Sequence, residues 1–191
     1  KLFQKNLLFN KLKEHDENQS DPSTPKHTNK EGVSGGLDFD ATPKDKEVIF
    51  APNKGPQTEF LSASEREVLY GGSAGGGKSA GLLADPLRYF SVPSFNGLLL
   101  RRTNDELREL VWASQELYPK AYPGAKWAEK KSQWTFPSGA RLWMTYLERP
   151  EDVLRYQGQA FSWIGFDELT QHPTSFAWDY MRSRLRTTDP N

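Results

Sequence analysis

Short apolar runs, separated by polar and glycine-rich stretches, occur along most of this 191-residue chain. Two of them, residues 97–101 (GLLLR) and 161–166 (FSWIGF), have the length and composition of buried β-strands. Residues 134–136 and 141–147 flank a Pro137-Ser138-Gly139 turn, and this arrangement predicts a β-hairpin. The pattern therefore predicts a sheet that contains these segments.

Three helices are predicted before, between and after these strands. The first covers residues 78–84, and Pro86 kinks or ends it. The second begins at Thr103, because Thr103 and Glu106 have the spacing of a capping box. The third covers residues 176–186. Since strands alternate with helices, the sequence predicts a three-layer α/β domain on a mainly parallel sheet, with the hairpin as an insertion.

The first 46 residues differ from the rest of the chain. Residues 1–13 have apolar residues at a spacing compatible with a short helix. Residues 14–36 hold almost no apolar side chains, so they cannot bury enough surface to offset their ordering entropy and are predicted to form a flexible linker. The compact domain is expected to cover residues 47–191.

Composition narrows the class of protein. Lys and Arg total 25, as do Asp and Glu, so no net charge points to nucleic acid or to an anionic membrane, although a local patch can still hold DNA. The chain has no cysteine and three histidines, which argues against disulfides and against thiolate or histidine metal sites. No apolar run reaches the ~18 residues of a membrane span. We therefore expect a soluble intracellular protein without a membrane partner.

A glycine-rich loop follows a short strand candidate at residues 67–70 (EVLY). The loop matches G-x-x-x-x-G-K-[ST], the pattern of a phosphate-binding (Walker A) loop between a strand and a helix. Its glycines let amide groups approach phosphate oxygens, and the helix N-terminus adds partial positive charge. Lys78 would reach the β- and γ-phosphates, and the Ser79 hydroxyl would ligate Mg²⁺. The predicted nucleotide-binding residues of the loop are Gly72, Ser73, Ala74, Gly75, Gly76, Gly77, Lys78 and Ser79. A flexible glycine linker is the alternative, but a linker has no need for lysine and serine at this offset.

An acidic pair, Asp167 and Glu168, directly follows the strand candidate at residues 161–166. The strand would bring Asp167 to the sheet edge, where it would hold Mg²⁺ directly or through water. Glu168 would polarise the attacking water as a general base, which favours hydrolysis over transfer to a metabolite. An acidic helix cap after a strand is the simpler alternative. With the glycine loop, the pair predicts a P-loop NTPase fold of the RecA/ASCE-like type that hydrolyses ATP with Mg²⁺.

Residues 50–191 resemble the ATPase domain of the large terminase subunit of tailed bacteriophages. Beyond the loop and the acidic pair, the resemblance rests on a Gly-Pro-Gln lead-in, an LLLRRT segment and an Arg-Tyr-Gln-Gly segment. These lie at residues 55–57, 98–103 and 155–158. Their combination is more specific than the two nucleotide motifs alone, which would name only a superfamily.

The resemblance implies an ATP-driven motor that packs double-stranded DNA into a capsid. It implies a portal protein, a small terminase subunit and a homo-oligomeric ring as partners, in the host cytoplasm and transiently docked on the procapsid. It also implies a coupling motif and a nuclease domain beyond Asn191. The chain is therefore expected to be a fragment with an incomplete sheet that hydrolyses ATP only feebly, and nuclease activity is not ascribed to it.

Two further residues take roles from the resemblance. Gln57 precedes the glycine loop at the interval where related motors place a glutamine that reads the adenine edge, and a solvated turn residue is the alternative. Arg155 matches an arginine finger that reaches the γ-phosphate of a neighbouring subunit, and an ordinary surface arginine is the alternative. Arg101 and Arg102 are rival candidates for a phosphate or ring-interface contact.

Two other functions stay open from the sequence. A helicase or another strand-separating ATPase shares the same core, and its distinguishing motifs would lie beyond Asn191. A nucleotide-binding structural subunit would not need to keep all of Lys78, Ser79, Asp167 and Glu168.

Overall fold

The computed structural model describes residues 48–72 and 75–186. The predicted N-terminal segment 1–46, with its short helix and its linker, lies outside these residues. Within the described residues, no helix is long and apolar enough to cross a membrane.

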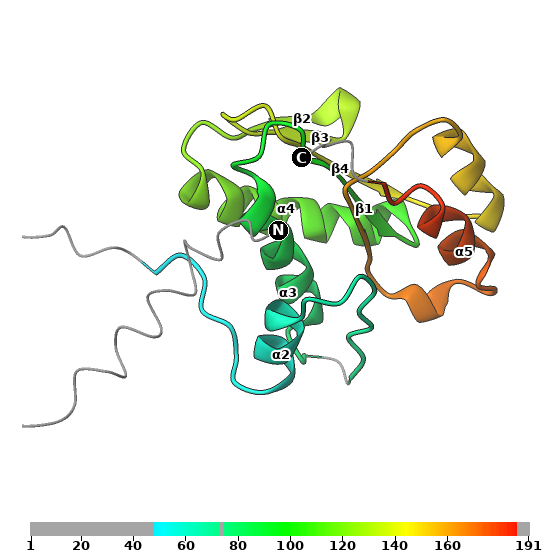
Figure 1. The fold of residues 1–191 in the computed structure, drawn as a ribbon, viewed down its shortest axis with the longest axis horizontal. Helices are drawn as coiled ribbons and strands as arrows, with labels where there is room; N and C mark the ends of the chain where they lie inside the picture. The colour runs from blue at the N-terminus through cyan, green and yellow to red at the C-terminus, as the bar shows by residue number, and fades with distance from the viewer. Residues whose placement is uncertain (1–47, 73–74, 187–191) are drawn as a thin grey trace, which may run out of the picture. The chain divides into compact units, whose positions relative to one another are not determined.

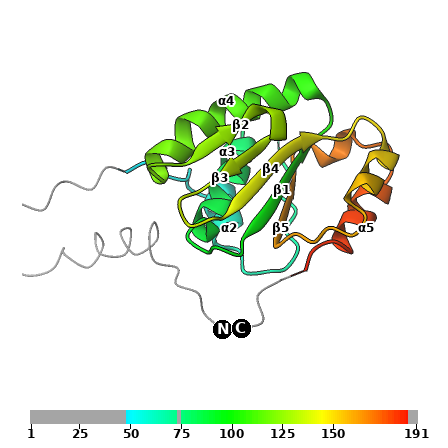
Figure 2. The same cartoon turned by 90° about the horizontal axis from the view of Figure 1, so that it is seen from above.

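The sheet has five strands in the order β2-β3-β4-β1-β5, of which β5 is labelled in Figure 2 and the others also in Figure 1. The strands are β1 (Asn96–Arg101), β2 (Lys126–Ala128), β3 (Gln133–Thr135), β4 (Arg141–Tyr146) and β5 (Trp163–Phe166). β1 pairs in parallel with both β4 and β5, whereas β2 with β3 and β3 with β4 are antiparallel. The prediction of a mainly parallel sheet is therefore wrong, and the sheet is mixed. The predicted hairpin exists, but its second strand β4 is a direct neighbour of β1, so the hairpin belongs to the sheet and is not an insertion.

The predicted helices are present, with one shorter than expected. The helical segments are α2 (Pro56–Ser62), α3 (Lys78–Ala84), α4 (Asn104–Ala121), α5 (Phe176–Arg182), and the 3₁₀ turns η1 (Asp85–Tyr89), η2 (Glu129–Lys131), η3 (Pro150–Tyr156) and η4 (Leu169–Gln171). Thr103 caps α4 as predicted, because its hydroxyl accepts a hydrogen bond from the Glu106 amide. Pro86 lies where α3 changes into η1, as expected. α2 was not predicted, and α5 ends four residues before the predicted end at residue 186.

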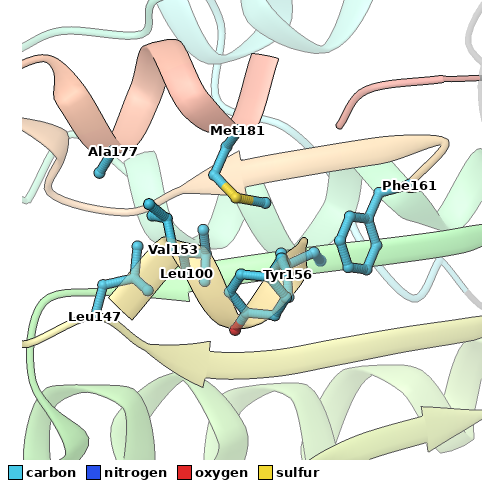
Figure 3. Close-up of a cluster of buried hydrophobic side chains, with 8 residues drawn as sticks. Leu100, Leu147, Val153, Tyr156, Phe161, Ala177 and Met181 are labelled. Atoms are coloured by element: carbon cyan, nitrogen blue, oxygen red, sulfur yellow. The ribbon is translucent and has the colours of Figure 1, made fainter. Parts of the chain in front are cut away.

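Helical segments cover β1 on both faces. The four central residues of β1 are buried, as expected for a strand in the middle of three layers. Leu98 and Leu100 face η3 and α5, where they pack in a cluster with Val153 and Met181 (Figure 3). On the other face α4 packs against β1 and β4, so that the strands run between α4 and α5 (Figure 2).

A second, aromatic core lies under α4. Tyr118 and Trp134 meet edge to face with ring centroids 5.4 Å apart. The Trp134 indole donates a hydrogen bond to the Ser114 hydroxyl at 3.0 Å, so its polar atom is satisfied inside the core. Trp134 is 2% exposed, whereas Trp112 is 58% exposed and packs under the Arg108 guanidinium.

The strand predicted at residues 67–70 does not form. Leu69 is 81% exposed, and the segment pairs with no described strand. Tyr70 instead stacks on Phe60 of α2 at 5.1 Å, and its hydroxyl donates to the Gly76 carbonyl at 2.7 Å. A strand is stable only when its backbone groups pair with a neighbour, and here the segment packs on α2. The prediction was therefore wrong.

Leu100→Ala should destabilise the protein far more than Leu154→Ala. Leu100 is fully buried against η3 and α5, so its truncation leaves a cavity and should cost about 2–5 kcal/mol. Leu154 is half exposed in η3, and the same change there should cost about 0.5 kcal/mol or less. Urea denaturation of the two variants gives the comparison, and equal losses of unfolding free energy would contradict the packing described.

Candidate functional site

The glycine-rich loop and the acidic pair meet at the carboxyl ends of β1 and β5. Ser79 is the second residue of α3, and Asp167 directly follows β5. The Ser79 hydroxyl donates to the two Asp167 carboxylate oxygens at 3.1 and 3.3 Å. The fold thus joins two segments that are 88 residues apart, at the sheet edge where ligands of open α/β folds bind.

The loop has the backbone conformation that its glycines permit. Gly75 and Gly77 have φ values of 79° and 71°, in the left-handed region that favours glycine. The Lys78 ammonium donates to the Gly72 carbonyl at 2.9 Å, and this hydrogen bond connects the two ends of the loop. Ser73 and Ala74 lie outside the described residues.

Gln57 braces this loop from α2. Its side chain is 3% exposed, its Nε2 donates to the Gly77 carbonyl at 2.8 Å, and its Oε1 accepts from the Asn53 amide at 2.6 Å. A Cβ atom at Gly77 would lie 2.7 Å from Gln57 Nε2, so glycine is also needed there for space. Both ends of the Gln57 amide are engaged within the chain. The role of adenine reader stays a prediction, and it would require these bonds to open.

Asp167 is paired with a cation from the neighbouring strand. Its side chain is 4% exposed, and the Arg101 guanidinium at the end of β1 forms an ion pair with it. A buried carboxylate is expensive unless it is paired and hydrogen-bonded, and Arg101 and Ser79 together meet this requirement. Sequence reasoning gave Arg101 only as a rival phosphate contact. The missed signal is that its strand lies beside the strand that delivers Asp167.

Arg101 also lies close to Glu106 in the first turn of α4. Arg101 Nε is 3.8 Å from Glu106 Oε2, which accepts a hydrogen bond from the Thr103 hydroxyl at 2.9 Å. The Gln171 amide donates to Glu106 Oε1 at 3.3 Å. Burial raises the pKa of Glu106, but the bonds from Thr103 and Gln171 and the charge of Arg101 outweigh it, and the pKa lies below its usual value. Glu106 is therefore ionised at neutral pH.

Glu168 lies in an uncommon backbone conformation. It has a φ of 52°, and it precedes η4, where its carbonyl accepts from the Gln171 amide at 2.9 Å. Left-handed geometry at a residue with a Cβ is costly, and such outliers gather at functional sites. The half-buried side chain follows Asp167 at the same sheet edge.

A buried acid fixes the relative position of α3 and β5. Asp85 directly follows α3, and its carboxylate accepts a hydrogen bond from the Trp163 indole of β5 at 2.8 Å. Arg88 forms an ion pair with the same carboxylate. Burial raises the pKa of Asp85, while the Arg88 charge and the two hydrogen bonds act against this. The contact joins the element that carries Ser79 to the strand that delivers Asp167.

Arg155 makes its contacts with other residues. It is exposed on η3, its guanidinium donates to the Tyr146 carbonyl at the end of β4, and it lies 5.3 Å from the Tyr156 ring centroid. Across the described part of the chain, no hydrogen bond or ion pair connects it to Ser79, Asp167 or Glu168. Arg102 likewise donates to the carbonyls of Leu147 and Glu148.

A comparison with protein families identifies the relatives of this chain. The family described as "Terminase large subunit, T4likevirus-type, N-terminal" matches residues 69–188, which is more than half of the chain. The chain belongs to this family. Every predicted site residue of the terminase chain except Gln57 lies within the matched region. A comparison with curated proteins gives no match.

Gln57→Ala should loosen the glycine loop of this terminase chain. It removes the hydrogen bond to the Gly77 carbonyl, which is worth about 1 kcal/mol, so amide exchange at residues 75–79 should be several-fold faster without nucleotide. Gln159→Ala is the matched control, because Gln159 is exposed and its side chain donates to the Arg155 carbonyl, outside the glycine loop. Hydrogen–deuterium exchange measures both, and unchanged loop protection in Gln57→Ala would show that Gln57 is not a brace.

Proposed function

We propose that this terminase chain is an ATP-hydrolysing motor domain that couples hydrolysis to the movement of double-stranded DNA into a capsid. The contact between the Ser79 hydroxyl and the Asp167 carboxylate carries the proposal, because it joins the two segments that a P-loop ATPase needs for phosphate and metal. Family membership supports a role in phage DNA packaging.

The residues at the contact fit a magnesium ion. Mg²⁺ prefers oxygen ligands, usually one or two from the protein and the rest from phosphates and water, and Ser79 and Asp167 offer a hydroxyl and a carboxylate. In the described residues there is no group of three or more His, Cys, Asp or Glu side chains that could hold a metal by itself, so the remaining ligands would come from the nucleotide and water. When bound, Mg²⁺ neutralises charge on the β- and γ-phosphates.

Groups of the chain itself would bind the phosphates and accept the proton. The amides of the glycine loop and the N-terminus of α3 bind phosphate oxygens, and Lys78 leaves the Gly72 carbonyl to bind the β- and γ-phosphates. Glu168 accepts a proton from the attacking water as the general base. Its left-handed backbone and the hydrogen bond that its carbonyl accepts from the Gln171 amide set the position of the Glu168 side chain.

The proposed partners rest on what the family resemblance implies. We propose double-stranded DNA, a portal protein and a small terminase subunit as partners, with a homo-oligomeric ring of terminase chains. We also propose that the chain acts in the host cytoplasm, docked on a procapsid. An exposed Arg155 is compatible with a finger that serves a neighbouring subunit in such a ring.

Lys78→Ala and Glu168→Gln should separate binding from hydrolysis. Lys78→Ala removes the charge that holds the phosphates, so binding of Mg-ATP should be lost. Glu168→Gln should keep Mg-ATP binding while hydrolysis slows by about 10²–10⁴-fold, since a general base contributes that much. Fluorescent-nucleotide binding and single-turnover hydrolysis give the two values. Lys126→Ala, on an exposed residue of β2, is the control, and equal loss of binding in both site variants would reject the roles assigned.

Arg155 should act on a neighbour's nucleotide. In assembled full-length terminase, Arg155→Ala should bind ATP but hydrolyse it about 10³–10⁵-fold more slowly, the contribution of arginine fingers in comparable systems. Mixing Arg155→Ala with Glu168→Gln subunits should restore part of the activity, because some interfaces then pair an intact Arg155 with an intact Glu168. With mixed assembly verified by native mass spectrometry, no recovery would exclude a finger acting in trans.

A further inference from the structure

Arg101 occupies the carboxylate that the proposed metal site needs. Its guanidinium is ion-paired with Asp167, and the same carboxylate also accepts the Ser79 hydroxyl hydrogen. Arg101 itself is mostly buried, with its side chain 12% exposed. In this arrangement the positive charge of Arg101 balances the Asp167 carboxylate, as a bound divalent cation would.

The arrangement leaves Arg101 incompletely satisfied. Its Nε atom is buried and, among the residues that the structure describes, has no hydrogen-bond partner. The nearest carboxylate oxygen is Glu106 Oε2 at 3.8 Å, which is beyond hydrogen-bonding distance. A small shift of the guanidinium toward α4 would close this gap.

Open space lies beside Arg101, which lines a cavity of about 320 Å³ together with Ser79 of α3 and Glu109 of α4. Glu106 and Glu109 are three residues apart on α4, so they lie on the same side of the helix. A guanidinium that leaves Asp167 toward α4 therefore meets the Glu106 carboxylate and does not become a buried unpaired charge.

We propose that Arg101 is a positioning residue that competes with the metal ion for Asp167 and moves to Glu106 when Mg-ATP binds. The inference rests on the proposed function, since it needs Mg²⁺ beside Ser79 and Asp167. A guanidinium and a divalent cation on one buried carboxylate repel each other strongly at low dielectric, so the two states exclude each other. Arg101 keeps Asp167 in place in the nucleotide-free chain. Mg-ATP must therefore bind strongly enough to displace Arg101 from Asp167.

The exchange extends to the segment after Glu168. Glu106 Oε1 accepts a hydrogen bond from Gln171, which ends η4, and the η4 turn begins on the Glu168 carbonyl. When Arg101 reaches Glu106, that carboxylate gains a cationic donor in addition to the neutral donors Thr103 and Gln171, and its hydrogen bond to Gln171 weakens. Metal binding at Asp167 is thereby linked to the turn that positions the proposed base.

A double-mutant cycle tests the exchange through binding alone. The measured quantity is the ratio of the Kd values of a fluorescent ATP analogue in EDTA and in Mg²⁺, which reports how much the metal assists binding. Arg101→Gln should raise this ratio about tenfold, because the competitor is gone, and Glu106→Gln should lower it several-fold, because Arg101 loses its alternative partner. Arg108→Gln is the control and should leave the ratio unchanged, since Arg108 is an exposed residue of α4 that pairs with Asp105.

The combined variant separates exchange from simple charge effects. In the Arg101→Gln background, Glu106→Gln should change the ratio by less than about twofold, since no arginine remains to move. Independent, additive effects would overturn the proposal, as would an unchanged or lower ratio in Arg101→Gln, which would assign Arg101 a purely structural role. If the unmodified chain bound no nucleotide and gained nothing from Mg²⁺, the proposed function would fall together with the inference. Circular dichroism verifies folding, and Glu106→Gln, on a partly exposed side chain, tests the exchange even if Arg101→Gln is unstable.

Discussion

The structure depends on the cost of burying the Asp167 carboxylate. An ionised carboxylate at the inner end of a strand must be compensated by donors and by a cation. Here the compensation comes from two other elements, the Arg101 guanidinium of β1 and the Ser79 hydroxyl of α3. One buried charge therefore connects the start of α3 to β1 and β5, which pair with each other through their backbones.

Side-chain bonds maintain this arrangement because α3 is short. A seven-residue helix has little stability of its own, and α3 is secured at both ends. Gln57 bonds to the Gly77 carbonyl at its N-terminus, and Asp85, just past its C-terminus, accepts the Trp163 indole of β5. The loop geometry is thus set by tertiary contacts from α2 and β5 more than by local helix propensity.

The sequence predicted what local pattern determines and failed where pairing decides. The strand at residues 97–101 and the Thr103 cap were predictable, because apolar runs and capping residues act locally. The hairpin was predicted, but its place within the main sheet was missed, because the pattern of β4 does not reveal that β1 lies beside it. The strand at residues 67–70 was wrong for the same reason, since an apolar run without a partner does not become a strand. The meeting of Ser79 with Asp167 was predictable from the two motifs, whereas the ion pair with Arg101 required the order of the strands.

The charges that face the proposed nucleotide site are already compensated within the chain. Lys78 donates to the Gly72 carbonyl, and Arg101 pairs with Asp167. Such internal pairing avoids leaving cations unpaired in a partly buried site, but a ligand must then replace these bonds, and its net affinity falls by their free energy. Because Mg-ATP brings both an anion for Lys78 and a cation for Asp167, it can replace both contacts together, whereas a nucleotide without metal replaces only the first. The internal pairing therefore favours binding of the metal complex over binding of the free nucleotide.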